Sequence, residues 1–231
     1  MLQLEDVEIV QDGFRLCANW SVPPSARVAV IGPSGAGKST LLSVISGFFP
    51  LHRGRVLWDG VDLAEMAPGA RPLSILFQDQ NLFPHLTLAQ NLGLGLRPDL
   101  RLSKDQHMLV EDAMNRVGLS GMGARRPSQI SGGQIGRAAL ARALLRARPL
   151  LLLDEPFAAL GPALKAEMLD LVSDVAKASG ATVLMVTHDP DDARAFADLT
   201  VLVADGVARP PVQTTALFAD PPPALRAYLG A

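Results

Sequence analysis

The sequence has little cysteine, few aromatic residues, little net charge and no long apolar run. Its one cysteine, Cys17, cannot form an internal disulfide, and in a strand-like segment it is expected to be a small, buried apolar residue. A net charge of −2 argues against a protein that binds nucleic acid through bulk electrostatics. No apolar run approaches the roughly 18 residues of a membrane span. Acidic residues also interrupt the N-terminus too early for a signal peptide. These absences predict a soluble, intracellular chain.

The rest of the composition is that of an ordinary globular protein. The chain has 231 residues, of which 48% are hydrophobic and 19% are charged. A chain of this length can bury a full core, so we expect one domain with an appended lobe.

The most informative stretch has the pattern Gly-x-x-x-x-Gly-Lys-Ser of a phosphate-binding P-loop. It lies between an apolar, β-branched run at 27–31 and a helical pattern at 38–47, which predicts a strand, a glycine-rich loop and a helix. Such a loop brings backbone N–H groups and a helix N-terminus to a phosphate. Lys38 would bind the terminal phosphates, and the Ser39 hydroxyl would ligate Mg²⁺. The predicted nucleotide-binding residues are Gly32, Pro33, Ser34, Gly35, Ala36, Gly37, Lys38, Ser39 and Thr40.

Three further buried strands are predicted to end in polar side chains at the same edge of a parallel sheet. The run 150–154 ends in Asp154, which is expected to hold Mg²⁺, and Glu155 follows as the candidate base for attack on the γ-phosphate. The run 73–77 ends at Gln78, whose amide oxygen is a further Mg²⁺ or water ligand or only a loop residue. The run 182–187 ends at His188, which either hydrogen-bonds the γ-phosphate or is merely a loop residue.

A second anion site is predicted at Ser131, Gly132, Gly133 and Gln134. These residues open a helical pattern, so they present a hydroxyl and free N–H groups at a helix N-terminus. Arginines 137, 142, 146 and 148 on that helix are interpreted as a solvated face. An earlier helix is expected to begin at Ser103, where Gln106 completes a capping box, and to end at Gly118.

The apolar loop that follows Gln78 has two interpretations. Residues 81–87 contain Leu82, Phe83, His85 and Leu86, which either fold back into the core or form an exposed patch that docks a partner. Near the N-terminus, residues 11–13 predict a hairpin turn, and Phe14 is a candidate to stack on an adenine ring. The C-terminal segment is expected to be a proline-rich tail.

Together these motifs resemble the ATP-binding subunits of ABC transporters over nearly the whole chain. Residues 32–40 are similar to Walker A, 130–134 to the signature motif and 150–155 to Walker B, with Gln78 and His188 at the Q-loop and switch positions. The resemblance implies an α/β fold: a RecA-like P-loop NTPase core with an antiparallel β subdomain and an inserted helical subdomain. It implies one ATP-binding domain over 1–231, with the core and β subdomain at about 1–80 and 149–231 and the helical subdomain at about 85–148.

The resemblance also implies ATP and Mg²⁺ as cofactors and a head-to-tail dimer. Each ATP would lie between Lys38 of one subunit and residues 131–134 of a second. It implies a transmembrane permease that docks near Gln78, which favours the partner patch at Leu82–Leu86. A periplasmic substrate-binding protein would be an indirect partner, and the subunit would lie on the cytoplasmic side of the bacterial inner membrane. Residues 76–78, 81–83, 85–87 and 89–96 look most like the ATPases of thiamine importers; importers of iron(III), polyamines, sulfate or molybdate are the alternative.

Three positions depart from the family pattern. Gln11 replaces the usual adenine-stacking aromatic, Ile135-Gly136 replaces the usual Arg or Gln pair, and Gly161 replaces an aspartate that communicates across the dimer. Two rival classes are a soluble ABC ATPase of DNA repair or translation and a non-hydrolysing cassette. The first usually carries a long insertion or tandem cassettes, and the second conflicts with the intact Asp154, Glu155 and His188.

Overall fold

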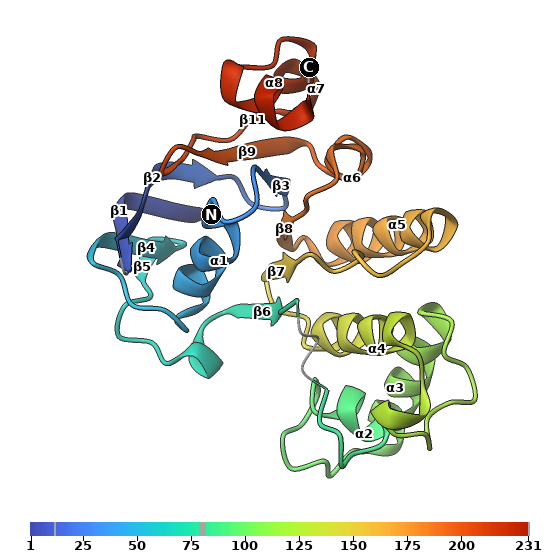
Figure 1. Cartoon of the computed structure of the whole chain (residues 1–231). Coiled ribbons are helices and arrows are strands. Elements are labelled where there is room, and N and C mark those ends of the chain that lie inside the picture. Colours follow the sequence, from blue (N-terminus) through green and yellow to red (C-terminus); the bar gives the residue numbers. More distant parts are fainter. Residues whose placement is uncertain (12, 79–81, 231) are drawn as a thin grey trace.

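A single mixed β-sheet runs through the protein (Figure 1). The computed structural model describes residues 1–11, 13–78 and 82–230, so Asp12 and Asn81, which belong to the predicted turn and loop, lie outside the described residues. The strands are β1 (Leu2–Gln11), β2 (Phe14–Val22), β3 (Arg27–Ile31), β4 (Arg53–Trp58), β5 (Val61–Asp62), β6 (Leu73–Leu76), β7 (Leu150–Asp154), β8 (Thr182–Val186), β9 (Leu199–Ala204), β10 (Val207–Ala208) and β11 (Val212–Gln213).

Helices connect and cover these strands. They are α1 (Lys38–Ser46), α2 (Leu88–Gly93), α3 (Lys104–Arg116), α4 (Gly132–Leu145), α5 (Pro162–Ser179), α6 (Pro190–Phe196), α7 (Thr214–Ala219) and α8 (Pro223–Leu229), with short 3₁₀ turns at Pro68–Ala70 and Pro127–Gln129. Ser103 caps α3 together with Gln106, as the sequence predicts.

The sheet has a parallel part and an antiparallel part. Strands β6, β7, β8, β3 and β9 are neighbours in that order and run parallel, with Val28 opposite both Leu184 and Leu199. Strands β1, β2, β4 and β5 pair antiparallel, and β10 joins the two parts by pairing with both β2 and β9. The carboxyl ends of the parallel strands therefore lie along one edge, where ligands bind in α/β proteins.

The two faces of the parallel part are buried against different layers. Ala29 and Ile31 of β3 belong to one hydrophobic cluster with residues of α2 to α8, whereas Val28 and Val30 belong to another with α1 and the antiparallel strands. Because side chains alternate along a strand, burial on both faces requires the continuous apolar runs that identified these strands in the sequence.

Helices α2, α3 and α4 contact one another and lie at one end of the molecule, beyond β6 (Figure 1). The hydrophobic cluster that contains Val110 and Met114 of α3 continues to Leu153 of β7, so these helices share apolar packing with the sheet. The subdomain limits at about 80 and 149 stay a prediction.

Two expectations from the sequence were wrong. The proline-rich tail contains α7 and α8, because Pro223 occupies the first turn of α8, where its missing N–H is harmless. The arginines of α4 are not uniformly solvated. Arg137 donates to the carbonyls of Val117 and Gly118 at 2.7 and 3.3 Å, and burial lowers the pKa of Arg142.

None of the helices that the structure describes combines the length and the apolar composition needed to cross a membrane.

Candidate functional site

The loop between β3 and α1 admits only glycine at two positions. Gly32 has φ +148°, and a Cβ there would lie 2.0 Å from the carbonyl oxygen of Val203 in β9. Gly37 has φ +98°, and its Cβ would lie 2.4 Å from the ring of Phe14. The loop is therefore pressed against the sheet, and it leads directly into the N-terminus of α1, whose N–H groups favour an anion.

The ammonium group of Lys38 lies within this loop. Its side chain is 7% exposed, and the ammonium donates to the carbonyl oxygens of Gly32 and Pro33, at 2.8 Å each. Burial lowers the pKa of Lys38, and the nearby carboxylates of Glu155 and Asp154 oppose that shift. A poorly hydrated cation at this position attracts a phosphate more strongly than one in bulk water.

Ser39 of α1 and Asp154 at the end of β7 bring a hydroxyl and a carboxylate together. The Ser39 hydroxyl donates to a carboxylate oxygen of Asp154 at 3.0 Å, and Asp154 is 5% exposed. Burial raises the pKa of Asp154, the Ser39 hydrogen bond opposes that rise and Glu155 adds to it. A cation beside this desolvated carboxylate would supply the charge that favours its ionised form.

These oxygens fit Mg²⁺ bound together with a nucleotide. In the part of the chain that the structure describes, no group of three or more His, Cys, Asp or Glu residues could hold a metal by itself. Mg²⁺ usually takes only one or two protein ligands and completes its shell with water and phosphate oxygens. Gln78, exposed at the end of β6, lines the same cavity and is placed to add an amide oxygen.

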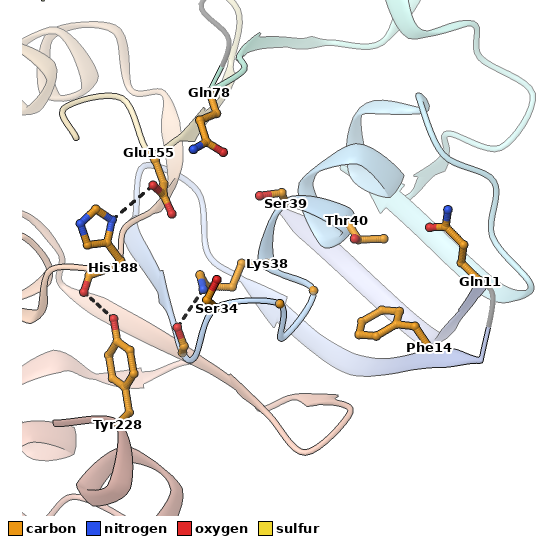
Figure 2. Close-up of a pocket in the computed structure, with 13 residues that line it drawn as sticks. Gln11, Phe14, Ser34, Lys38, Ser39, Thr40, Gln78, Glu155, His188 and Tyr228 are labelled. Atoms are coloured by element: carbon orange, nitrogen blue, oxygen red, sulfur yellow. Dashed lines mark hydrogen bonds and ion pairs between the residues drawn. The ribbon is translucent and has the colours of Figure 1, made fainter. Parts of the chain in front are cut away.

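Glu155 and His188 point toward one another across this cavity (Figure 2). A carboxylate oxygen of Glu155 lies 3.2 Å from Nδ1 of His188. The Glu155 backbone is left-handed, with φ +46°, and its N–H donates to the carbonyl oxygen of Val186 at 3.1 Å. The end of β8 thus fixes the backbone of Glu155 in a conformation that side chains rarely adopt.

The cavity has a volume of about 900 Å³. Seven of the nine predicted loop residues line it, together with Gln78, Glu155 and His188; Pro33 and Ala36 do not. Gln11 and Phe14 line its far side, near Thr40 (Figure 2). Phe14 is half-buried and Gln11 is exposed, so the aromatic ring and the amide are both available to a base.

Sequence reasoning missed Tyr228, which also lines the cavity. Its hydroxyl donates to the backbone carbonyl of His188. The contact joins residues far apart in the sequence, and a tyrosine in a segment interpreted as a tail gave no signal of it.

The predicted second anion site lies elsewhere. Ser131 and Gly132 are exposed at the N-terminus of α4, where the hydroxyl of Ser131 accepts from the Gln134 N–H at 3.3 Å and the Gln134 side chain accepts from the Ser131 N–H at 2.9 Å. Among the described residues that line the cavity, none comes from 131–134. A single chain therefore does not bring the two anion sites together.

The apolar loop after Gln78 is divided between core and surface. Leu82 and Leu86 are half-buried, and Leu82 packs on the core, whereas Phe83 and His85 are exposed. Asn91, fully buried in α2, accepts from the Phe83 N–H at 2.7 Å and donates to the carbonyls of Phe83, Leu86 and Thr87 at 3.1, 3.3 and 3.0 Å. Sequence reasoning also missed this residue, which holds the loop in shape.

Comparison with known proteins identifies the family. The family model described as ABC transporter matches residues 17–158. The chain belongs to the ABC transporter family. ATP is the nucleotide that this family binds.

Curated relatives match the chain over its full length or most of it. It is similar to the thiamine import ATP-binding proteins of Cereibacter sphaeroides (64% identical over 230 residues, covering 100% of both chains) and of a Ruegeria species (58% over 231 residues, covering 100% of both). A third, from Rhizobium meliloti, is 49% identical over 205 residues, covering 89% of this chain and 86% of the relative.

Solved structures confirm the expected fold. The chain is similar to a dimeric, post-hydrolysis ATP-binding cassette bound to ADP and Pi, with a TM-score of 0.82 and 27% identity over 93% of this chain and 99% of the other. A dimeric bacterial ABC transporter cassette matches with a TM-score of 0.83 at the same identity and coverage. The α/β P-loop core inferred from the motifs is therefore correct.

Proposed function

We propose that this chain is the ATP-hydrolysing subunit of a bacterial importer whose cargo is thiamine or thiamine phosphates. The observation that supports thiamine as the cargo is the 64% identity over the full chain with a thiamine import ATP-binding protein. Nothing in the ATP site selects a cargo. The reaction is supported by the geometry: a buried Lys38 in the P-loop, the Ser39–Asp154 oxygen pair, and Glu155 facing His188.

The positions of the side chains support the following roles. The glycines and Lys38 hold the β- and γ-phosphates. Ser39, Asp154 and Gln78 are the residues that would hold Mg²⁺, which supplies charge neutralisation at the phosphates when bound. Glu155 orients and deprotonates the attacking water, and His188 presents its imidazole to the γ-phosphate side of the cavity.

The proposal includes a dimer of this chain. Residues 131–134 present a hydroxyl and helix N–H groups, and they lie outside the chain's own ATP cavity. They would close the ATP site of a second subunit, and the two similar cassette structures are both dimers. ATP binding would close the dimer, and loss of the γ-phosphate would reopen it.

The membrane partner would dock beside Gln78. The exposed Phe83 and His85 form an edge-on aromatic pair, with ring centroids 6.0 Å apart. The buried Asn91 holds their loop through hydrogen bonds to its backbone. Exposed Phe48 lies edge-on to Phe77, next to Gln78. Phe83 exposes apolar surface beside the half-buried Leu82 and Leu86. Exposed apolar surface marks protein contacts, so we assign Leu82, Phe83, His85 and Leu86 to contact with a transmembrane permease. The subunit would then lie peripherally on the cytoplasmic side of the inner membrane, with the substrate-binding protein an indirect partner.

Glu155→Gln tests both the reaction and the cargo. Without a carboxylate base, phosphate release should fall by about 100-fold or more while ATP still binds. Cells that depend on this subunit should also stop accumulating labelled thiamine. Glu167→Gln, at an exposed position of α5, is the matched control and should behave as wild type.

The two readouts separate the two parts of the proposal. Unchanged phosphate release in Glu155→Gln would exclude Glu155 as the base. If the wild type hydrolyses ATP normally but thiamine is not taken up, the ATPase activity would stand and the assignment of thiamine as the cargo would be wrong.

A further inference from the structure

The C-terminal helix α8 lies against the ATP site. Leu225 is fully buried in the same hydrophobic cluster as Ile31, at the end of the strand that leads into the P-loop. From the same helix, the half-buried Tyr228 reaches the His188 segment, as Figure 2 shows. The anchored helix therefore delivers a hydroxyl group to the edge of the cavity.

The residues on both sides of His188 are held by side chains. The Thr187 hydroxyl donates to Asp192 at 2.9 Å and accepts from the Asp189 N–H at 3.0 Å. Lys165 of α5 contacts Asp189 at 2.6 Å and Asp192 at 2.9 Å. The Asp189 N–H belongs to the peptide group that follows His188, so Thr187 already holds one side of that group, and its other side is the His188 carbonyl.

Tyr228 makes the bond to that carbonyl. Its hydroxyl donates to the His188 oxygen, while the His188 ring lies 3.2 Å from Glu155. Because this peptide group is bonded to the His188 Cα, holding its carbonyl restrains rotation about the Cα–C bond and so limits the positions that the imidazole can take. Burial raises the pKa of Tyr228, with Asp189 and Glu155 adding to the rise, so the hydroxyl remains a donor at physiological pH.

We propose that Tyr228 is a positioning residue for ATP hydrolysis: by holding the His188 carbonyl, it sets the direction in which the imidazole faces Glu155 and the γ-phosphate side of the cavity. The inference rests on the proposed function and adds a residue and an element, α8, that the sequence motifs do not include. It predicts that the loss of one hydroxyl changes the rate of the reaction rather than the binding of ATP.

Tyr228→Phe in the full chain, assayed with ATP and Mg²⁺, is the test. The ring and its packing remain, so the melting temperature should shift by no more than about 2 °C. We expect kcat to fall by about 3- to 10-fold, as the loss of one positioning hydrogen bond implies, while KM for ATP stays within about twofold. Arg226→Ala, exposed on the same helix, is the control and should leave kcat and KM unchanged.

A double-mutant cycle with His188→Ala separates positioning from general support of the fold. If Tyr228 acts through the imidazole, Tyr228→Phe should have no further effect on rate once that side chain is gone. Single-turnover hydrolysis measures the slow rates that this background requires. The melting temperature should change equally in both backgrounds, because the carbonyl is still present in His188→Ala.

Two results would overturn the inference: an unchanged kcat in Tyr228→Phe, or a rate loss of the same factor with and without the His188 side chain. Both leave the proposed function intact if the wild type hydrolyses ATP. A wild-type chain that releases no phosphate with ATP and Mg²⁺ would overturn the proposed function and the inference together.

Discussion

At the scale of single residues, the site depends on groups whose surroundings oppose their charge. Lys38 and Asp154 are both buried, and burial shifts the pKa of each toward its neutral form. Bound phosphate and a cation would reverse these shifts by supplying the missing opposite charges. Binding of phosphate at Lys38 and of a cation at Asp154 would therefore favour the charged form of each side chain.

Lys38→Ala should weaken ATP binding by at least about tenfold, because it removes a charge-assisted contact to phosphate. Binding of a fluorescent ATP analogue, competed with unlabelled ATP, measures the loss. Lys104→Ala, which removes an exposed lysine at the start of α3, should leave the affinity unchanged. ATP affinity equal to that of the wild type in Lys38→Ala would contradict the assignment of the loop.

The residues that could be predicted from the sequence are those that belong to a local sequence motif with fixed spacing. The P-loop needs glycines at fixed positions, and Gly32 and Gly37 occupy sites where a Cβ would collide with other atoms. Tyr228 and Asn91 act through tertiary contacts, to the His188 and Phe83 carbonyls. No spacing rule predicts such contacts, so both residues were missed.

At the scale of elements, α5 and α6 are joined by one lysine between two carboxylates. Lys165 contacts Asp189 and Asp192 at the start of α6, directly after His188. The hydrogen bond from Lys165 holds the pKa of Asp189 below its usual value. Burial alone would lower the pKa of Lys165, but its bonds to Asp189 and Asp192 outweigh burial and raise it.

The pair therefore stabilises the fold between two pH limits. Asp189, with its depressed pKa, contributes above its unfolded pKa of about 3.9, and the contribution is lost as pH falls through the folded value. Lys165, with its raised pKa, contributes below its unfolded value of about 10.4, and that contribution is lost as pH rises through the folded value.

Lys165→Gln should accordingly lower the free energy of unfolding by about 1 kcal/mol at pH 7. The difference from wild type should shrink below about pH 4 and above about pH 10.5. Urea denaturation at several pH values measures it, with Lys104→Gln as the exposed control. A difference independent of pH would show that packing of the lysine chain, and not its charge, is what matters.

Elements with strong end signals could be predicted, whereas those with mixed signals could not. The capping box predicted the start of α3, and continuous apolar runs predicted β7 and β8. Helix α8 did not, because Pro221, Pro222 and Pro223 indicate a tail when the burial of Leu225 is unknown. The glycine at Gly136 does not prevent α4 from forming, since it is buried where the helix packs.

At the scale of the whole molecule, the two predicted anion sites lie apart: one lines the cavity at the edge of the sheet and the other does not. Residues 131–134 lie at the start of α4 and do not line the chain's own cavity. Position 132 is open, with no heavy atom within 4 Å of a Cβ built there. A side chain added at Gly132 is therefore compatible with the fold of the single chain, and in the proposed dimer it would lie at the ATP site of the partner.

Gly132→Glu separates folding from assembly. An acidic residue in the first turn of a helix favours the fold but would repel the phosphates of a partner's ATP, so hydrolysis should fall while the melting temperature stays the same or rises. Gly132→Gln, the neutral counterpart, should lose less activity. Phosphate release and thermal unfolding measure the two effects.

Mixing this variant with Lys38→Ala tests the dimer directly. In a mixed dimer, the P-loop of the Gly132→Glu chain meets the intact residues 131–134 of the Lys38→Ala chain, which makes one complete site. Half of randomly formed dimers are mixed and each has one of two sites, so activity should recover to about a quarter of the wild-type rate. No recovery on mixing would mean that each site is complete within one chain.

The left-handed backbone at Glu155 has a consequence for inheritance. Folding alone favours Gly, Asn or Asp at φ +46°, whereas the proposed reaction uses the longer carboxylate. Replacement of Glu155 by Gly or Asp should therefore give subunits that fold at least as well as the parent and pair with it, yet do not complete the cycle. Such alleles should be dominant over a wild-type copy, while alleles that unfold the chain should be recessive.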